Sequence, residues 1–339
     1  MSQLRRFKGK GGTILILAGA SLFAFITFFA LVADFGHIFV TKAELQNVAD
    51  SAALAAVVDI QNGLAQARQT AVSFGETHRV AGSPILIDSG DIAFGYYDLN
   101  AEQFLPGETP TNAITVNAKR TEGSLSGPLT LFFARLFGKD TSNVQAVSIA
   151  VTESGVVGVR ARGGLIPLAA RDLIVDQDGD GEFDLGLTVD ILPRNEAPGN
   201  FWYLDFNGGS NSNDELQDWI ENGYDQDFAI PAGDGVGVWG SVEVEGTTGI
   251  RGESVAEAFQ AILDKEVFLP VHNGVSGQGA NALYNVIAIL AVRIVDVNFT
   301  GSQSERYVRA ELISVNSSAL ITHPDAPENN SLQKTRLVL

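Results

Sequence analysis

The chain of 339 residues contains no cysteine. Disulfides, thiol catalysis, zinc–thiolate sites and iron–sulfur clusters are therefore excluded. Basic residues are also scarce, with 22 against 40 acidic residues, and the formal net charge is −18. A field of this sign repels polyanions, so we expect no nucleic-acid partner. The length is sufficient for a membrane anchor and two modest domains.

The sequence also lacks the common catalytic motifs. Its four histidines are far apart, and it contains no H-E-x-x-H, G-x-S-x-G or Walker A pattern. A G-x-G-x-x-G pattern over residues 235–240 lies in a glycine-rich segment without a βαβ context, and this favours turns over a dinucleotide site. Because no nucleophile–base pair is visible, we predict a non-enzymatic protein without catalytic or cofactor-binding residues.

One long stretch lacks charge altogether. From Thr13 to Ala33 there are 21 uncharged residues. At about 1.5 Å per residue a helix of this length spans about 30 Å, the thickness of a bilayer's hydrocarbon core. Four basic residues precede the stretch and Asp34 follows it. We therefore predict a cytoplasmic basic tail (1–11), a transmembrane helix (12–33), and a remainder on the periplasmic or extracellular side of the membrane.

Two alternatives to a retained anchor remain open. A cleaved secretory signal has a shorter apolar region, about 7–15 residues, followed by a small-x-small site. Leu31 and Ala33 fit such a site poorly. Prepilin-type cleavage between Gly12 and Thr13 would place glutamate where Leu17 stands. The length and the flanking charges favour a retained anchor.

The predicted helix continues beyond the apolar span without a proline to about Val58. Apolar and small residues recur there every seven residues, in the series Ile38-Leu45-Ala52 and Thr41-Val48-Ala55. This spacing is typical of a packed helix seam. We expect the seam to pack on the protein's own domain, and self-association through it is the alternative.

The N-terminal features have a characteristic order: a basic start, an apolar span, Asp34 and Gly36 at its end, then LQNVADSAALAA. This order resembles TadG-like proteins of the Flp/Tad (tight adherence) pilus-assembly family. Further segments that look like the family are IAFGYYDLNAEQFLPG, NAITVNAKRT, PLTLFFARLFG, PGNFWYLDF, ELQDWIENGY, VFLPV and GQGANALYNV. The resemblance thus covers most of residues 11–315. It implies a structural role in assembly or anchoring of a pilus, or in adhesion, with other pilus-assembly or pilin-like proteins as partners.

Residues 34–153 have the pattern of a membrane-proximal α+β domain. Asn62-Gly63 is a plausible helix break, and helical spacing then resumes from residue 64 to 78. Strands are expected at 92–97, 113–119 and 144–151, and a short helix is expected at 128–137. Helices and strands in this order predict an α+β fold.

From Gly155 onward glycine and aspartate become frequent and the apolar runs become short. Regular short strands with turn signals predict a mainly-β, sandwich-like outer domain over residues 154–320. Helices are expected at 214–221 and 254–263, the second opened by a capping box, Ser254-x-x-Glu257. The polar segment 321–339 predicts a flexible tail.

The strongest chemical signal is the run Asp176-Gln-Asp178-Gly-Asp180-Gly181-Glu182-Phe-Asp184. Oxygen ligands at alternate positions, followed by glycine for a sharp turn, suit a hard cation such as calcium. Leu187 stands where an EF-hand has its bidentate glutamate, and the flanks look like strands, so the run is not an EF-hand. We predict a calcium site and leave a bare acidic turn open; its ligands would be Asp176, Asp178, Asp180, Asp184 and the backbone carbonyl of Glu182.

A second function is compatible with the same sequence. A calcium-dependent surface adhesin or carbohydrate-binding protein would use the acidic run together with aromatic side chains. Such residues are more often part of a core. The candidates are Trp202, Tyr203, Trp219, Tyr224 and Trp239.

Overall fold

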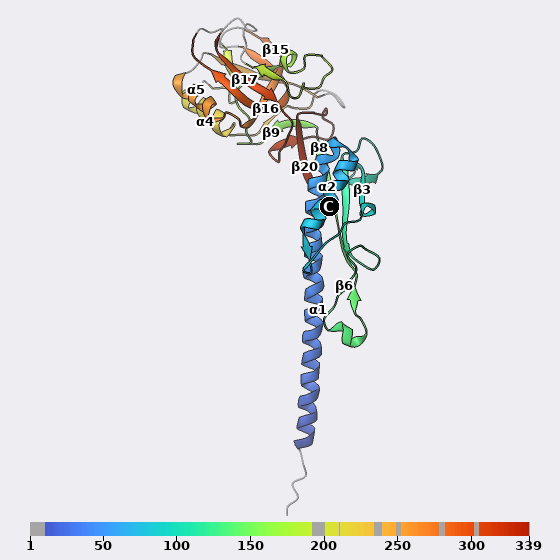
Figure 1. Ribbon diagram of the computed structural model, residues 1–339. Coiled ribbons are helices and arrows are strands. Elements are labelled where there is room, and N and C mark those ends of the chain that lie inside the picture. The colour runs from blue at the N-terminus through green and yellow to red at the C-terminus, as the bar shows by residue number, and fades with distance from the viewer. Residues whose placement is uncertain are drawn as a thin grey trace, which may run out of the picture. The chain divides into compact units, whose positions relative to one another are not determined.

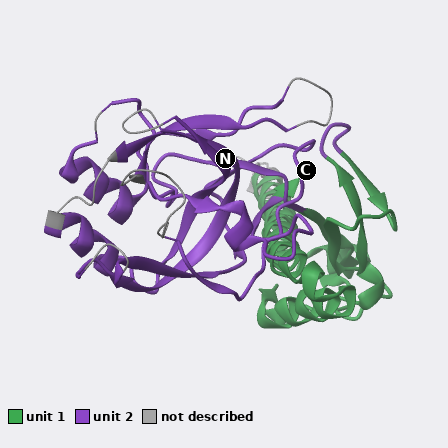
Figure 2. Ribbon diagram, turned by 90° about the horizontal axis from the view of Figure 1, so that it is seen from above, with its two compact units in different colours: residues 1–98, 103–151, 337–339 green, residues 99–102, 152–336 purple. Residues whose placement is uncertain are grey.

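The protein divides into two compact units, which Figure 2 shows in different colours. Unit 1 comprises Met1–Asp98, Gln103–Val151 and Leu337–Leu339, and unit 2 comprises Leu99–Glu102 and Thr152–Arg336. The division after Val151 lies beside the boundary expected after residue 153. The computed structural model describes residues 11–191, 201–209, 211–233, 239–248, 252–277, 282–301 and 305–338.

Unit 1 is built on one long helix, α1 (Gly11–Val58), which continues from the apolar span into the folded domain (Figure 1). A 3₁₀ turn, η1 (Asp59–Asn62), follows it, and Gly63 takes a positive φ of 104° before α2 (Leu64–Thr77). The predicted break at Asn62-Gly63 and the second helix are thus confirmed, since glycine tolerates this conformation at low cost.

The sheet of unit 1 is antiparallel, with its strands in the order β8-β5-β3-β4. Three of these strands match the sequence prediction and β4 was not expected. The bounds are β3 Ile92–Asp98, β4 Gln103–Pro106, β5 Ala113–Arg120 and β8 Val144–Glu153. A short pair, β1 (Arg79–Val80) and β2 (Ser83–Pro84), follows α2.

The second half of α1 packs on this sheet. Ile114, Val116 and Ala118 alternate along β5 and are fully buried in the same cluster as the helix. The small side chains let the helix approach the sheet closely, as the sequence indicated. The seam therefore packs on the chain's own domain, as we expected, and its buried helix residues are Leu45, Val48, Ala49, Ala52, Ala53, Ala56 and Val57.

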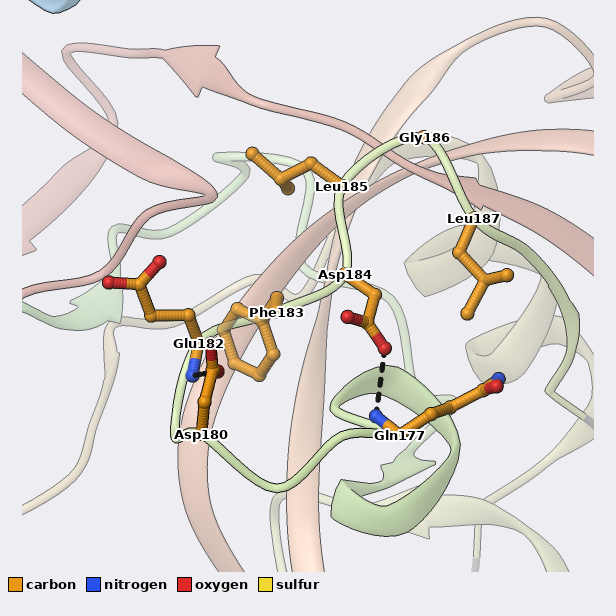
Figure 3. A pocket seen from close by; sticks show the side chains of 8 residues that line it. All are labelled: Gln177, Asp180, Glu182, Phe183, Asp184, Leu185, Gly186 and Leu187. Carbon is orange, nitrogen blue, oxygen red and sulfur yellow. Dashed lines mark hydrogen bonds between the residues drawn. The ribbon is translucent and has the colours of Figure 1, made fainter.

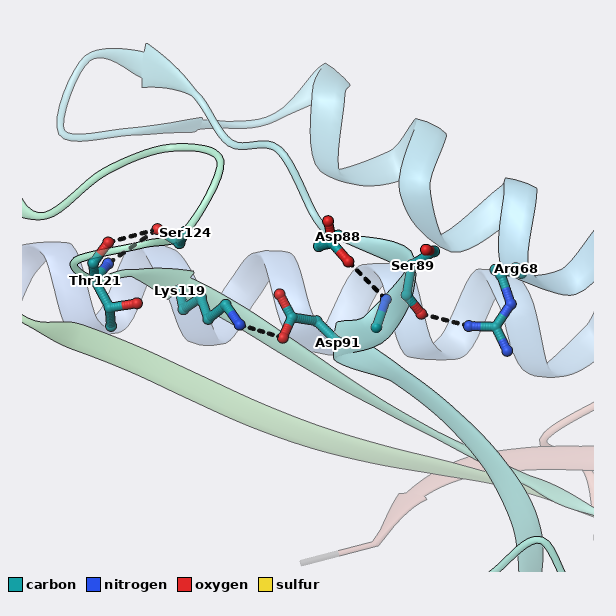
Figure 4. Close-up of polar contacts among 8 residues, drawn as sticks. Arg68, Asp88, Ser89, Asp91, Lys119, Thr121 and Ser124 are labelled. Atoms are coloured by element: carbon teal, nitrogen blue, oxygen red, sulfur yellow. Dashed lines mark hydrogen bonds and ion pairs between the residues drawn. The ribbon is translucent and has the colours of Figure 1, made fainter.

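Polar contacts fix α2 to the sheet (Figure 4). Arg68 of α2 donates hydrogen bonds to the carbonyls of Ser89 and Ile92, at 2.5 Å and 2.9 Å. Ser89 is the first residue of the short helix η2 (Ser89–Asp91) and Ile92 follows it, and Asp91 of this helix pairs with Lys119 of β5. The start of β3 is thus held from both α2 and β5.

The helix predicted at residues 128–137 is wrong. The segment forms a hairpin instead, from β6 (Leu129–Thr130) and β7 (Thr141–Ser142), with a 3₁₀ turn, η3 (Ala134–Phe137), between them. The physical reason is a partner distant in the sequence, because Asp34 takes the hydrogen bonds of three backbone amides in this segment. The hairpin lies alongside α1 (Figure 1).

Unit 2 contains a seven-stranded sheet with the path β10-β15-β16-β14-β12, and β17 joins β11 to β16. Adjacent strands of this sheet pair antiparallel, except β10 and β15, which pair parallel. The bounds are β10 Ala170–Arg171, β11 Thr188–Asp190, β12 Phe201–Asp205, β14 Val242–Thr248, β15 Glu266–Ser276, β16 Leu283–Asn298 and β17 Tyr307–Leu312.

Both faces of this sheet are buried, because side chains of β16 alternate between two cores. Leu290 and Val292 join α4 (Asn213–Asn222) and α5 (Gly252–Ala261) in one core. Ile289 and Ala291 join the other core, which includes residues of a three-stranded sheet. That sheet covers the second face as in a sandwich, and its order is β13 (Phe228–Ala229), β9 (Val156–Val159), β19 (Leu320–Thr322). The α+β class with a β-rich outer part is confirmed.

Two details of unit 2 correct the sequence prediction. Helix α5 begins at Gly252, so Ser254 lies inside it and does not open it. A capping box does open α4, where Ser212 Oγ accepts from the Glu215 amide at 3.1 Å and the Glu215 side chain accepts from the Ser212 amide.

The flexible tail predicted for residues 321–339 is also wrong, since the segment contains β20 (Leu332–Val338), which pairs with β18 (Val315–Asn316). Two of its polar residues, Asn329 and Ser331, are buried and satisfy backbone groups of the core. Asn329 donates to the Ile289 carbonyl at 2.8 Å, and Ser331 Oγ accepts from the Ala291 amide at 2.9 Å. The polar composition predicted a loose tail, because the sequence alone does not show which polar side chains form buried hydrogen bonds.

Candidate functional site

The acidic run lies between α3 (Asp172–Val175) and β11 in unit 2. The prediction of a strand immediately before the run is wrong. Residues 172–175 form one helical turn, which the Asp176 amide closes with a 2.9 Å bond to the Asp172 carbonyl. The loop thus begins at the end of a short helical turn and ends in the strand that pairs with β17.

The structure brings three of the five predicted ligands together. Carboxylate oxygens of Asp176, Asp178 and Asp180 lie within 4.8 Å of one another. Backbone amides within the loop hold them: Asp176 accepts from Gly179 at 2.8 Å and from Gly181 at 3.0 Å. Both glycines have positive φ, 74° and 90°, which lets the chain wrap around the Asp176 carboxylate. The loop therefore holds these three carboxylates close together through its own backbone.

The side chains of Asp184 and Glu182 are not part of this group of three carboxylates, and the backbone carbonyl of Glu182 stays a predicted ligand. The Asp184 carboxylate accepts from the Gln177 amide at 2.8 Å, and the Glu182 side chain points away from Asp184 (Figure 3). Asp180, Glu182 and Asp184 line a pocket of about 580 Å³. Oxygen ligands at this density suit a hard divalent cation, whose charge would offset the repulsion among the carboxylates.

A different kind of surface covers the first half of α1. Within the described residues, one helix is long and apolar enough to cross a membrane, from Ile14 to Asn62. Its large apolar side chains between Ile14 and Val32 are all exposed, whereas Leu45 and Val48 are buried. The same helix therefore has an uncovered apolar half and a half that belongs to the core of unit 1.

Asp34 lies where these two halves meet, and it is buried. Its two carboxylate oxygens accept four hydrogen bonds, at 2.6–3.2 Å, from the amides of Phe132, Phe133 and Ala134. Burial raises the pKa of the Asp34 carboxyl, but these hydrogen bonds lower it by more, and its pKa lies below the ordinary value. The carboxylate thus stays charged and binds the β6–β7 hairpin to α1.

Two family models match the chain. A model described as Flp pilus-assembly TadE/G-like matches residues 11–67, and one described as Tad-like Flp pilus-assembly matches residues 41–150. Residues 11–150 thus match models of Tad-like Flp pilus-assembly proteins. These matches support a role in pilus assembly. No curated protein and no solved structure matches the chain.

The two matches lie almost entirely in unit 1. Together they cover all of α1 and the elements up to β8, including Asp34 and the β6–β7 hairpin. They end at residue 150, before the segment Thr152–Arg336 that forms most of unit 2, so the resemblance suggested for residues 151–315 stays a prediction.

Sequence reasoning used Asp34 only as the charged end of the apolar span and did not foresee its contact with the hairpin. The two segments are about 100 residues apart, and no local pattern connects them. The one available signal was the aspartate itself, because a buried carboxylate needs hydrogen-bond donors.

Most of the aromatic side chains considered for a carbohydrate platform belong to the core. Tyr203, Trp219 and Tyr224 are buried, and the ring centroids of Trp219 and Tyr224 are 4.9 Å apart. Trp239 is half-buried, and the Trp202 side chain lies outside the described residues. The three buried rings are not exposed for stacking on a sugar.

Proposed function

We propose that this protein is a non-enzymatic, membrane-anchored component of Flp pilus assembly, with residues 13–33 of α1 as its span. The observation that carries the proposal is the exposure of α1 inside the family match. Its large apolar side chains from Ile14 to Val32 are 51–75% exposed, and water disfavours such a surface. A bilayer removes that surface from water and needs no further protein contact.

The proposed orientation has the N-terminus in the cytoplasm and both units on the outer side of the bacterial inner membrane. Arg5, Arg6, Lys8 and Lys10 precede the span and Asp34 follows it. Basic residues favour the cytoplasmic side of a span. The outer portion would then contact other pilus-assembly or pilin-like proteins, and this contact is the anchoring or scaffolding role that we propose.

The absence of cysteine allows a direct test of the orientation. Single cysteines at Ser2 and at the exposed Ser318 are expected to differ completely in spheroplasts. A membrane-impermeant maleimide should label position 318 at once and position 2 only after permeabilisation. Labelling of position 2 alone in intact spheroplasts would reverse the orientation, and loss of the protein into the soluble fraction would favour a cleaved signal.

A deletion strain can distinguish a role in pilus assembly from a role in adhesion. Without this chain, filaments on the cell surface should disappear and should return with the full-length chain but not with one lacking residues 13–33. Co-purification of the intact protein with other pilus-assembly components would support the same role. Normal filament numbers with a loss of surface attachment would instead assign the protein to adhesion.

We further propose that the acidic loop binds one calcium ion weakly and makes unit 2 rigid after export. The juxtaposed carboxylates of Asp176, Asp178 and Asp180 support this proposal. Without a bidentate glutamate at the twelfth position the site has few ligands, and a Kd of roughly 10⁻⁴–10⁻³ M is expected, as in extracellular modules. Such an affinity suffices where calcium is abundant.

Calcium should raise the melting temperature of unit 2 by mass action. With a Kd of ~0.5 mM, 5 mM calcium adds about 1.4 kcal/mol, or roughly 3–6 °C. Asp178→Ala should abolish the rise. Glu182→Ala removes the same charge from the same loop but not a clustered carboxylate, and so it should retain the rise. Calorimetry without heat of binding at millimolar calcium would leave only an acidic turn.

A further inference from the structure

The turn of the β6–β7 hairpin presents an unusual surface, here termed the apolar loop (residues 131–139). Phe132, Leu136 and Phe137 are 63%, 80% and 67% exposed. Large apolar side chains gathered in one short loop on a soluble surface mark an interaction site. Within the described part of unit 1 the His37 ring contacts Phe132, and all three side chains stay mostly exposed.

The position of the apolar loop along α1 is fixed by several contacts. Asp34 holds the amides of residues 132–134, and the rings of His37 and Phe132 are 4.7 Å apart. Ala30, one turn before Asp34 on the same helix face, is 6% exposed, whereas its neighbours Phe29 and Leu31 are exposed. Four residues of helix correspond to about 6 Å, so the loop lies beside the last turn of the uncharged span.

We propose that the apolar loop is a second membrane contact, which inserts Phe132, Leu136 and Phe137 into the leaflet where the span of α1 ends. The inference rests on the proposed anchoring of α1. Its main support is continuity, because the exposed side chains of the loop lie next to the exposed apolar surface of the helix. A bilayer that receives the helix must meet the loop at the same level.

The basic residues of the apolar loop favour a lipid surface as its binding partner. Arg135 and Lys139 are exposed within the loop, in a chain whose formal net charge is −18. Basic side chains beside inserted apolar residues suit phosphate headgroups, as in interfacial segments. A protein partner is less consistent with the size of the patch, since a stable interface buries about 800 Å² per partner. Three side chains fall well short of that area.

The test measures the depth of single probes on the full-length protein in vesicles of phosphatidylcholine and phosphatidylglycerol. Because the chain has no cysteine, an environment-sensitive fluorophore can be attached at Leu136→Cys alone. Phe29→Cys reports on the span. Val147→Cys is the matched control, an exposed apolar residue of unit 1 whose backbone meets Gln46, about 18 Å beyond Asp34 along α1.

Lipids that carry a nitroxide just below the headgroup should quench the probe at position 136 at least two-fold and leave the probe at 147 unchanged. Deeper nitroxides should quench the probe at 29 more strongly. Quenching at 29 but not at 136 would overturn the second contact and leave the anchor intact. No quenching at 29 would overturn both. A probe at 136 that lipids do not quench, but that is shielded from iodide, would indicate a second copy or another protein in place of lipid.

Discussion

Replacement of Asp34 by alanine is expected to release the β6–β7 hairpin from α1. The carboxylate accepts four hydrogen bonds, at 2.6–3.2 Å, from three consecutive amides. Hydrogen bonds to a charged group contribute about 1.5–3 kcal/mol each, and amides left without an acceptor add a further cost. A loss of roughly 3 kcal/mol would raise the open population of the hairpin by about 100-fold.

The apolar loop contains its own reporter of this release, because trypsin cleaves after Arg135 and Lys139. Cleavage there should become much faster in Asp34→Ala, and the amides of residues 132–134 should lose protection from hydrogen exchange. Asp91→Ala is the matched control, since Asp91 pairs with Lys119 in the same unit and does not contact the hairpin. Equal cleavage rates in wild type and Asp34→Ala would show that other contacts hold the loop.

The effect of Asp34 also has a defined pH dependence. Its folded pKa lies below the ordinary value, so the carboxylate stabilises the hairpin fully above an unfolded pKa of about 3.9. That stability is lost as the pH falls through the lower folded pKa. Tryptic cleavage is not possible at such pH, and hydrogen exchange is the appropriate measurement.

Much of unit 1 could be predicted from sequence because its signals are local. A continuous uncharged span without proline predicted α1, and glycine after asparagine predicted the break before α2. Alternation of apolar residues predicted β5, whose Ile114, Val116 and Ala118 all face the helix. Each of these patterns lies within a few residues of the element that it specifies.

The failures share the opposite property, because the deciding partner is distant in the sequence. Residues 128–137 have helix-forming composition, but Asp34 captures their amides. The polar residues Asn329 and Ser331 seemed solvated, but they bond to the backbone of β16 and its neighbours. No periodicity can report such contacts, since they depend on the fold that they help to stabilise.

The candidate metal loop falls between these cases. The spacing of Asp176, Asp178 and Asp180 is local, and their carboxylate oxygens lie within 4.8 Å of one another, while the binding of an ion stays a prediction. The parts that depend on the surrounding loop were less predictable. Asp184 instead accepts from the Gln177 amide, and Phe183 is fixed by Asn330, whose side chain bonds both its amide and its carbonyl.

The largest single effect on the stability of unit 2 is expected from Trp219→Ala. Trp219 is 2% exposed, and its ring centroid lies 5.8 Å from that of Phe206 and 4.9 Å from that of Tyr224. Removal of a buried tryptophan costs about 3–5 kcal/mol through lost burial and the cavity left behind. That is a large part of the roughly 5–15 kcal/mol by which a domain is stable.

Calorimetry of the full-length protein should show the transition of unit 2 lowered by roughly 6–20 °C in Trp219→Ala. Leu173→Ala removes an exposed apolar side chain of the same unit and should shift the transition little. The experiment also distinguishes the two roles considered for the aromatic residues, in the core or in a carbohydrate-binding surface. As a core residue, Trp219 determines stability. If it were part of a sugar platform, Trp219→Ala would leave the melting temperature within about 2 °C of wild type and abolish binding on a glycan array, because exposed stacking residues contribute little to folding.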